Sequence, residues 1–340
     1  MKANRCSFVS RIVSPISTII TLTTALALGA CGSKGQAPGA GFAPGGAPAK
    51  SAQPRSGNAT AEQVAEEMRG DVDCPARVAT KARDSKAPVD DVLGVRPGLT
   101  YEEAANLVLC TNDLMVVTAD GRGFQIKTYG ETLRQGFSAR LAQPRVEKSS
   151  KQIMQEMQDY TIGRSGNRVN EDMKPGESKW YVGTIGLPGK ERVINVAREE
   201  WFAEGRNPTM ESVEQALLKK YGAPTRNQPS TGTQKYITWA YDTFGRPITE
   251  TSPLFNRCTG VADPDGGANF SPDCGEVVSA IIFSMPDNPA LSRFFQVGVV
   301  DQAGGYEALT ATEQGLQQMD AARKAQQVKE AAKNSDTPSL

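Results

Sequence analysis

The centre of the chain reads KWYVGTIGLPGKERVINVAREEW, residues 179–201. Residues 179–187 and 192–201 alternate in the manner of β-strands, and Pro188-Gly189 between them is a turn signal. We therefore predict an antiparallel hairpin here. The aromatic residues of this region are expected to pack in the core or at sheet edges rather than to stack on a ligand. They are Trp180, Tyr181, Trp201 and Phe202.

Capping residues predict short helices on the N-terminal side of this hairpin. Thr60 with Gln63, and Thr100 with Glu103, have the spacing of capping boxes, in which each side chain accepts from the other residue's backbone N–H. We expect one helix over residues 60–68 and a second one directly after Thr100.

The best-defined helix of the sequence covers residues 209–221. Thr209 is placed to cap it, and Gly222 with Pro224 ends it. Strand signals follow at residues 236–241, 276–283 and 294–300. A turn, a capped helix and a run of strands thus occur twice in the chain. The pattern predicts an α+β fold of short helices packed on antiparallel sheets, arranged as two modules over residues 59–205 and 206–309.

Two further helices are predicted, one within the first module and one after the second. Residues 146–160 are amphipathic, and one face carries Ile153, Met154 and Met157. The tail, residues 310–340, opens with Thr310 and Glu313 as a capping box and has few large apolar residues. We expect a solvated helix that frays into a disordered end.

The first thirty residues have the features of an export signal. Lys2, Arg5 and Arg11 precede an apolar stretch over residues 12–28, and no acidic residue interrupts them. The stretch ends in LGAC, residues 28–31, which resembles the lipobox of bacterial lipoproteins. The resemblance implies that residues 1–30 are removed and that Cys31 carries lipid. An ordinary secretory peptide with a chance cysteine is an alternative. A single membrane-spanning helix is another, disfavoured by repeated Ser and Thr and by the lack of stop-transfer charges.

Gly, Ala, Pro, Ser and Gln dominate the segment that follows Cys31, up to residue 58. This composition predicts a flexible tether, with a coil span of about 30 Å. Gly32 follows the lipid-bearing position, and by the sorting rule of enteric bacteria this implies the outer membrane, with the body facing the periplasm. Without residues 1–30, 35 basic residues face 38 acidic ones, so bulk charge gives no attraction for nucleic acid.

Four cysteines remain besides Cys31 and the Cys6 of the export signal. An even number in an exported chain predicts two disulfides. Of the three possible pairings we favour Cys74 with Cys110 and Cys258 with Cys274, because each closes a loop within one region. A metal site is disfavoured, since the chain has no CxxC spacing and no histidine.

The absence of histidine also limits catalysis, because it removes the usual general base and the usual triads. Glu199 and Glu200 suggest a glycan-cleaving pair, but adjacent residues of a strand face opposite ways. A long loop over residues 242–275 holds four residues that could bind calcium, but their spacing does not fit an EF-hand. These are Asp263, Asp265, Asn269 and Asp273. We expect solvated turn residues there, and neither a cofactor nor a catalytic residue.

The stretch GVRPGLTYEEA, residues 94–104, resembles the opening of the SmpA/OmlA (BamE-like) lipoprotein domain. LLKKYGAP, residues 217–224, looks like the helix end of that family. The resemblance implies a small helix-plus-sheet module that binds envelope proteins or lipids as an accessory of outer-membrane protein assembly. This chain departs from the family in its greater length, its expected disulfides and its long loop.

Together these features predict a non-catalytic envelope lipoprotein that acts through protein–protein contacts, in outer-membrane assembly or maintenance. Its expected partners are the membrane, through Cys31, and another envelope protein. The alternative is an inhibitor or immunity-type lipoprotein that blocks an enzyme through the loop over residues 258–274, because a disulfide-held loop loses little entropy on binding.

Overall fold

The structure is a computed structural model. It describes residues 57–70, 72–75, 78–80, 82–83, 87–121, 124–155, 157, 173–229, 232–334 and 336. The predicted export signal, Cys31 and nearly all of the predicted tether lie outside the described residues.

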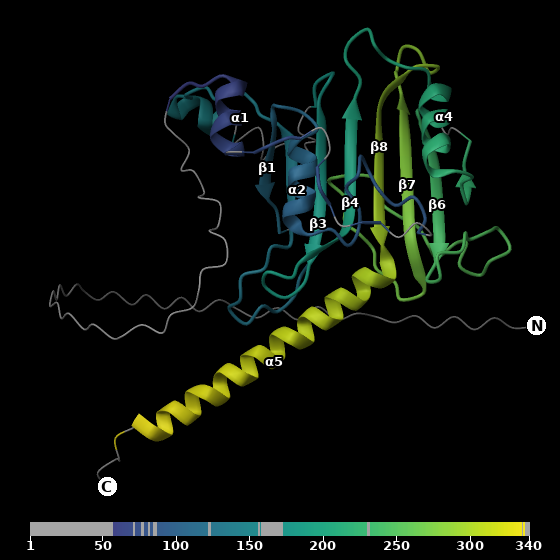
Figure 1. The fold of residues 1–340 in the computed structure, drawn as a ribbon. Helices are drawn as coiled ribbons and strands as arrows, with labels where there is room; N and C mark the ends of the chain where they lie inside the picture. Colours follow the sequence, from purple (N-terminus) through teal and green to yellow (C-terminus); the bar gives the residue numbers. More distant parts are fainter. Residues whose placement is uncertain are drawn as a thin grey trace, which may run out of the picture. The chain divides into compact units, whose positions relative to one another are not determined.

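An eight-stranded antiparallel sheet forms the centre of the described chain (Figure 1), and its strand order is β1-β2-β3-β4-β8-β7-β6-β5. The strands are β1 Met115–Ala119, β2 Gly136–Leu141, β3 Ser178–Ile185, β4 Arg192–Trp201, β5 Arg226–Asn227, β6 Gln234–Asp242, β7 Cys274–Ser284 and β8 Ser292–Asp301. The helices are α1 Ala61–Arg69, α2 Tyr101–Leu109, α4 Met210–Tyr221 and α5 Gln302–Asn334. The predicted α+β class is confirmed.

The predicted hairpin is confirmed as β3 and β4, which lie in the middle of the sheet. They pair antiparallel, with Val182 opposite Val196. Their β-branched and aromatic side chains suit a pleated surface that is covered on both faces. Trp180 and Tyr181 are buried, whereas Trp201 and Phe202 are half-buried.

The two predicted modules share one sheet. The first contributes α2 and β1–β4, the second contributes α4 and β5–β8, and β4 pairs with β8 so that Val196 lies opposite Val299. Along the chain, α2 precedes β1–β4 and α4 precedes β5–β8. The described residues belong to one compact unit instead of two separate sheets. Backbone pairing between β4 and β8 satisfies an edge that each half would otherwise expose.

Capping side chains begin the short helices as predicted. The reciprocal hydrogen bonds of a capping box are present at Thr60 with Gln63 and at Thr100 with Glu103. Thr209 accepts from the backbone N–H of Ser212 at the start of α4. Gly222 ends that helix with φ 82°, a conformation that favours glycine.

Helices α2 and α4 pack on one face of the sheet, which we call the helix face; they lie in front of the sheet in Figure 1. Trp180 and Trp239 are almost fully buried there. We call the opposite face the open face. Helix α1 lies on its β1 side, where Ala65 packs on Val116. Part of the 242–275 loop covers the end where Val277 and Val300 lie.

The predicted start of the C-terminal helix at Thr310 is wrong, because α5 begins at Gln302. Asp301, the last residue of β8, accepts from the backbone N–H of Gly304 and so caps the first turn. Thr310 lies inside the helix, where its hydroxyl donates to the carbonyl of Tyr306. Leu316 is fully buried, so the first half of α5 belongs to the core. From residue 321 to 334 the helix is exposed, as expected of a solvated helix.

The helix predicted over residues 146–160 is shorter among the described residues. Residues 150–155 and 157 are helical, residues 146–149 are not, and 158–160 lie outside the described part. The three residues of its predicted apolar face, Ile153, Met154 and Met157, are exposed.

Both predicted disulfide pairings are confirmed. Cys74 is joined to Cys110 at the end of α2, and Cys258 is joined to Cys274 at the start of β7. The second bond closes the long loop between β6 and β7, which is otherwise unusually long for a compact domain.

Candidate functional site

Three aromatic side chains form a stack across the open face, and we call them the aromatic row. They are Trp201 of β4, Phe294 of β8 and Phe283 of β7, which lie opposite one another in the register of the sheet. The ring centroids of Trp201 and Phe294 are 4.7 Å apart, and those of Phe294 and Phe283 are 4.1 Å apart. All three side chains are half-buried, so each ring presents part of its surface to solvent.

A cationic side chain packs on the Trp201 ring of the row. The guanidinium of Arg293 lies 4.3 Å from the centroid of the Trp201 ring, and Arg293 is exposed. Such a contact is attractive because the face of the indole ring is electronegative. Tyr236, which is 37% exposed, lies on the same face of the neighbouring strand β6. It pairs with Ile281, two residues before Phe283 on β7. The surface is therefore rich in aromatic residues and arginine.

The buried carboxylate of Glu199 orients the Trp201 ring of the row. Glu199 is 5% exposed and accepts from Trp201 Nε1 at 2.6 Å and from Gln296 Nε2 at 2.7 Å. Lys179 Nζ lies 3.8 Å from the same carboxylate. A charge removed from water in this way is stable only when it is paired and hydrogen-bonded. The network thus holds the indole ring in one position.

Residues 258–264 of the long loop lie directly on the open face. A Cβ added at Gly298 would be 2.2 Å from the carbonyl oxygen of Val261, and one at Gly260 would be 2.6 Å from the hydroxyl of Ser279. Only glycine allows so close an approach of the loop to the strands. Asp265 then forms an ion pair with Lys179, which joins the loop to the network below the aromatic row.

A hollow of about 560 Å³ continues the same face toward α1. Its lining includes Met68 of α1, Ser138 and Arg140 of β2, and Pro264 and Asp265 of the loop. It is polar where the loop borders it and apolar beside α1. Lys179 links the hollow to the network of Glu199, because it lines the hollow and lies 3.8 Å from the Glu199 carboxylate.

The four residues considered for calcium are not brought together. Asp265 pairs with Lys179, Asp273 pairs with Arg257, and Asp263 accepts from Gln296. Within the described ranges, no three acidic or cysteine side chains are arranged to hold a metal ion. Glu199 lies on the open face, whereas Glu200 pairs at 2.6 Å with Arg198 on the helix face. The two carboxylates therefore face opposite sides of the sheet.

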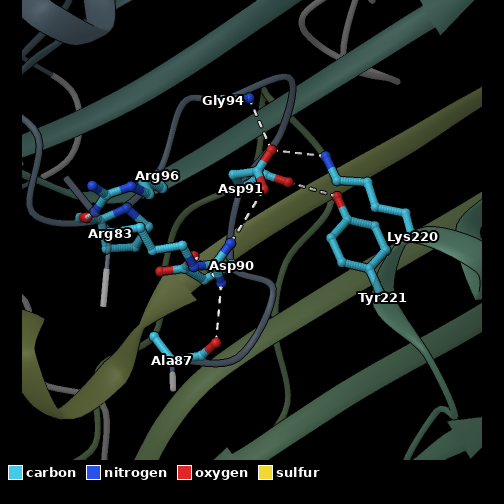
Figure 2. A network of polar contacts seen from close by, with 9 residues as sticks. Arg83, Ala87, Asp90, Asp91, Gly94, Arg96, Lys220 and Tyr221 are labelled. Carbon is cyan, nitrogen blue, oxygen red and sulfur yellow. Dashed lines mark hydrogen bonds and ion pairs between the residues drawn. The ribbon is translucent and has the colours of Figure 1, made fainter. Parts of the chain in front are cut away.

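A second polar network lies on the helix face and joins the turn before α2 to α4 (Figure 2). The Asp91 carboxylate accepts from Gly94 N–H at 2.8 Å and from Lys220 Nζ at 2.9 Å. Its backbone carbonyl accepts from the Tyr221 hydroxyl at 2.8 Å. Burial opposes ionisation of Asp91, but the hydrogen bonds from Lys220 and Gly94 outweigh it and lower its pKa. These contacts hold the turn in place.

An apolar hollow of about 320 Å³ lies beside this network, between α4 and the turn. Phe202, Leu217 and Phe295 are among its lining residues, and Lys220 stands at its edge. Both cations that line the hollow are in ion pairs, Lys220 with Asp91 and Arg198 with Glu200.

Glu276 has the most displaced carboxyl pKa of the helix face. Burial raises the pKa of Glu276 to about 7, and the neighbouring carboxylates of Asp90 and Asp301 add to the effect. Arg83 opposes it, and Arg83 also pairs with Asp90 at 2.8 Å. This cluster lies on the opposite side of the sheet from the aromatic row.

Phe283, Phe294, Gln296 and Arg293 are not among the site residues predicted from the sequence. Phe283 and Phe294 fall inside predicted strands, so their positions in the sheet could be predicted from the alternation of residues. The strand order, which places them beside Trp201, comes only from the fold. Cys31 lies outside the described residues. The disulfide cysteines are buried at positions 258 and 274.

Comparisons with family models, with curated proteins and with solved structures each found no match to this chain. Among the helices of the described residues, none has both the length and the apolar character to cross a bilayer.

Proposed function

We propose that the chain is a non-catalytic envelope lipoprotein that binds another protein across the open face of its sheet. The observation that carries this proposal is the half-exposed aromatic row of Trp201, Phe294 and Phe283 with Arg293 on its outer side. Trp, Tyr and Arg dominate the binding energy of protein interfaces. Aromatic rings supply large contact areas at a small cost in side-chain entropy.

The rigidity of the row supports recognition of a defined partner. Its rings stand on three central strands, and the buried Glu199 carboxylate fixes the indole of Trp201. A surface that is ordered before binding loses less conformational entropy in the complex. The neighbouring hollow of about 560 Å³ gives the same surface a recess for a projecting side chain or loop.

The lipid anchor is part of the proposal. The lipobox resemblance assigns the lipid to Cys31, and the Gly- and Pro-rich segment after it serves as a tether. Two disulfides suit a compartment that oxidises thiols. Gly32 and the resemblance to SmpA/OmlA domains favour the outer membrane, facing the periplasm, and a role in its assembly or maintenance.

The non-catalytic part of the proposal rests on residue types and their placement. The chain has no histidine. Glu199 is occupied by Trp201 and Gln296 and belongs to a structural network. A binding role needs none of these groups to move a proton.

Site-specific crosslinking in intact cells tests the proposal. A photoreactive amino acid at Phe294 should crosslink to one defined envelope protein. The same amino acid at Phe244, which is 80% exposed and lies away from the row, should not. A Trp201→Ala change should abolish the Phe294 crosslink. Equal capture from both positions, or no capture at Phe294, would contradict the proposal.

A second candidate is an inhibitor or immunity-type lipoprotein. It is favoured by the Cys258–Cys274 bond, which holds the loop beside the aromatic row. Residues 258–264 pack on the sheet, so an inhibitory contact would use the exposed part of the loop around Asn269. In that case Asn269→Arg should abolish protection from the target enzyme, and Trp201→Ala should weaken it. Protection that survives both changes would exclude this candidate.

A further inference from the structure

Exposed apolar side chains concentrate at one corner of the body. Eleven large hydrophobic residues are exposed in the described chain, and five of them fall in α1 or in residues 146–157. These five, which we call the entry patch, are Met68 (48% exposed), Val146 (62%), Ile153 (47%), Met154 (71%) and Met157 (66%). Clustered exposed apolar side chains on a soluble domain mark a contact surface.

The entry patch lies where the tether joins the folded body. Ala59 and Arg145 exchange backbone hydrogen bonds of 2.9 Å in both directions. The Arg145 side chain donates to the carbonyl of Gly57 at 3.0 Å and pairs with Glu67 of α1 at 3.1 Å. Glu147 N–H donates to the side chain of Asn58 at 2.7 Å. The segment that carries the patch is thus bonded to the first described residues and to α1.

We propose that the entry patch docks on the lipid surface that holds the anchor. The proposal rests on lipidation of Cys31, which is part of the proposed function. Ile153, Met154 and Met157 have the spacing that places them on one side of a helical turn. Lys148 and Lys151 are exposed in the same segment, as is Glu147. An apolar face bordered by lysines is typical of segments that lie at the boundary of headgroups and acyl chains.

With a short tether, weak binding of the entry patch to lipid is sufficient to keep the patch on the membrane. The composition between Cys31 and Gly57 predicts a coil with a span of about 30 Å, so insertion of the proposed lipid keeps the patch close to the membrane. Binding of the second group is then intramolecular and takes place at a high effective concentration. No comparable cluster of apolar side chains accompanies Phe244 or Val328, which are exposed singly among the described residues.

A fluorescence experiment on the processed, lipidated protein tests the proposal. The protein is reconstituted into vesicles of phosphatidylethanolamine and phosphatidylglycerol. An environment-sensitive dye is placed on the thiol of Met154→Cys or, as a control, of Phe244→Cys. The dye at position 154 should shift its emission to the blue and be quenched by spin-labelled lipid, whereas the dye at position 244 should show neither effect. In a third protein the dye is at Val146→Cys, and adding Met154→Asp with Met157→Asp should remove its quenching.

Each other outcome has a definite meaning. A protein that remains on the vesicles while the dye at 154 stays in water overturns the docking and leaves the anchor intact. A protein that does not remain on the vesicles overturns both the anchor and the docking. A blue shift at 154 without vesicles, or only after another protein is added, assigns the patch to a protein contact and overturns the lipid surface. Crosslinking through Phe294 is independent of all three.

Discussion

The indole N–H of Trp201 donates to the carboxylate of Glu199, 2.6 Å away and two residues earlier on β4. Residues two apart on a strand share a face, so a buried charge lies directly beside a half-exposed ring. The same carboxylate accepts from Gln296 on the neighbouring strand. The proposed binding surface and the charge that stabilises it are therefore adjacent on one strand.

Replacing Glu199 by alanine should destabilise the fold and loosen Trp201. Glu199→Ala leaves two donors without their acceptor, and we expect a loss of about 2–4 kcal/mol in the free energy of unfolding. Glu200→Ala is the matched control on the same strand. Glu200 is 35% exposed and pairs with Arg198, so its loss should cost less than about 1 kcal/mol. Urea unfolding measures both. Equal costs would show that the Glu199 network does not stabilise the sheet.

The stability of the chain should depend on pH through Glu276. Its pKa is raised from the ordinary 4.5 to about 7 in the folded chain, mainly by burial. Between these values the folded chain holds a proton that the unfolded chain has released. The contribution of Glu276 is thus fully present below pH 4.5 and is lost as the pH rises through 7.

A neutral side chain at position 276 isolates this effect. Glu276→Gln resembles the protonated glutamate, so the variant should match the parent near pH 4.5. At pH 8 it should be more stable by on the order of 1–3 kcal/mol. Urea unfolding at both pH values gives the two differences. A constant difference between variant and parent at all pH values would show that Glu276 does not titrate in this range.

Removing the disulfide that closes the long loop should lower stability. Cys258→Ala with Cys274→Ala frees a loop whose ends are 16 residues apart, and we expect a loss of about 3 kcal/mol. The corresponding change at Cys74 and Cys110, 36 residues apart, should cost about 4 kcal/mol on the same reasoning. Thermal unfolding followed by circular dichroism tests this order. No loss in the first variant would mean that the loop is held by its contacts with the sheet alone.

A methyl group at Gly298 should weaken the packing of residues 258–264 on the open face. In Gly298→Ala the new Cβ would meet the carbonyl of Val261, so we expect a cost of about 1–3 kcal/mol and faster amide exchange in residues 258–264. Gly267→Ala is the control in the same loop, because no atom lies within 4 Å of its added Cβ. It should change stability by less than about 0.5 kcal/mol. Unchanged exchange in Gly298→Ala would contradict the close packing.

The two halves of α5 should respond differently to truncation of an apolar side chain. Leu316 is fully buried, so Leu316→Ala should cost about 2–5 kcal/mol. Val328 is 69% exposed in the second half, and Val328→Ala should change the free energy of unfolding by no more than about 0.5 kcal/mol. Chemical unfolding compares the two. Similar small effects would mean that α5 does not belong to the core.

Local signals in the sequence were enough for the hairpin around Pro188, the capping boxes at Thr60 and Thr100 and both disulfide pairings. The hairpin and the capping boxes depend on residues close in the chain, and the disulfides were expected from an even number of cysteines in a chain with a predicted export signal. The predicted start of α5 is too late because Thr310 and Glu313 have the spacing of a capping box, although the helix begins at Gln302. The carboxylate of Asp301 became an N-terminal cap only because β8 ends there.

The absence of histidine and the alternation of the strands follow from the order of residues alone, and the prediction of lipid on Cys31 also rests on that order. The order of residues does not by itself determine the edge along which the two halves join. It also does not determine the stacking of Trp201, Phe294 and Phe283 in one row or the burial of Glu199. They depend on the pairing of β4 with β8, two strands separated by about a hundred residues. No local pattern encodes that pairing, because many registers satisfy the same alternation, and the choice depends on which side chains fill the shared core.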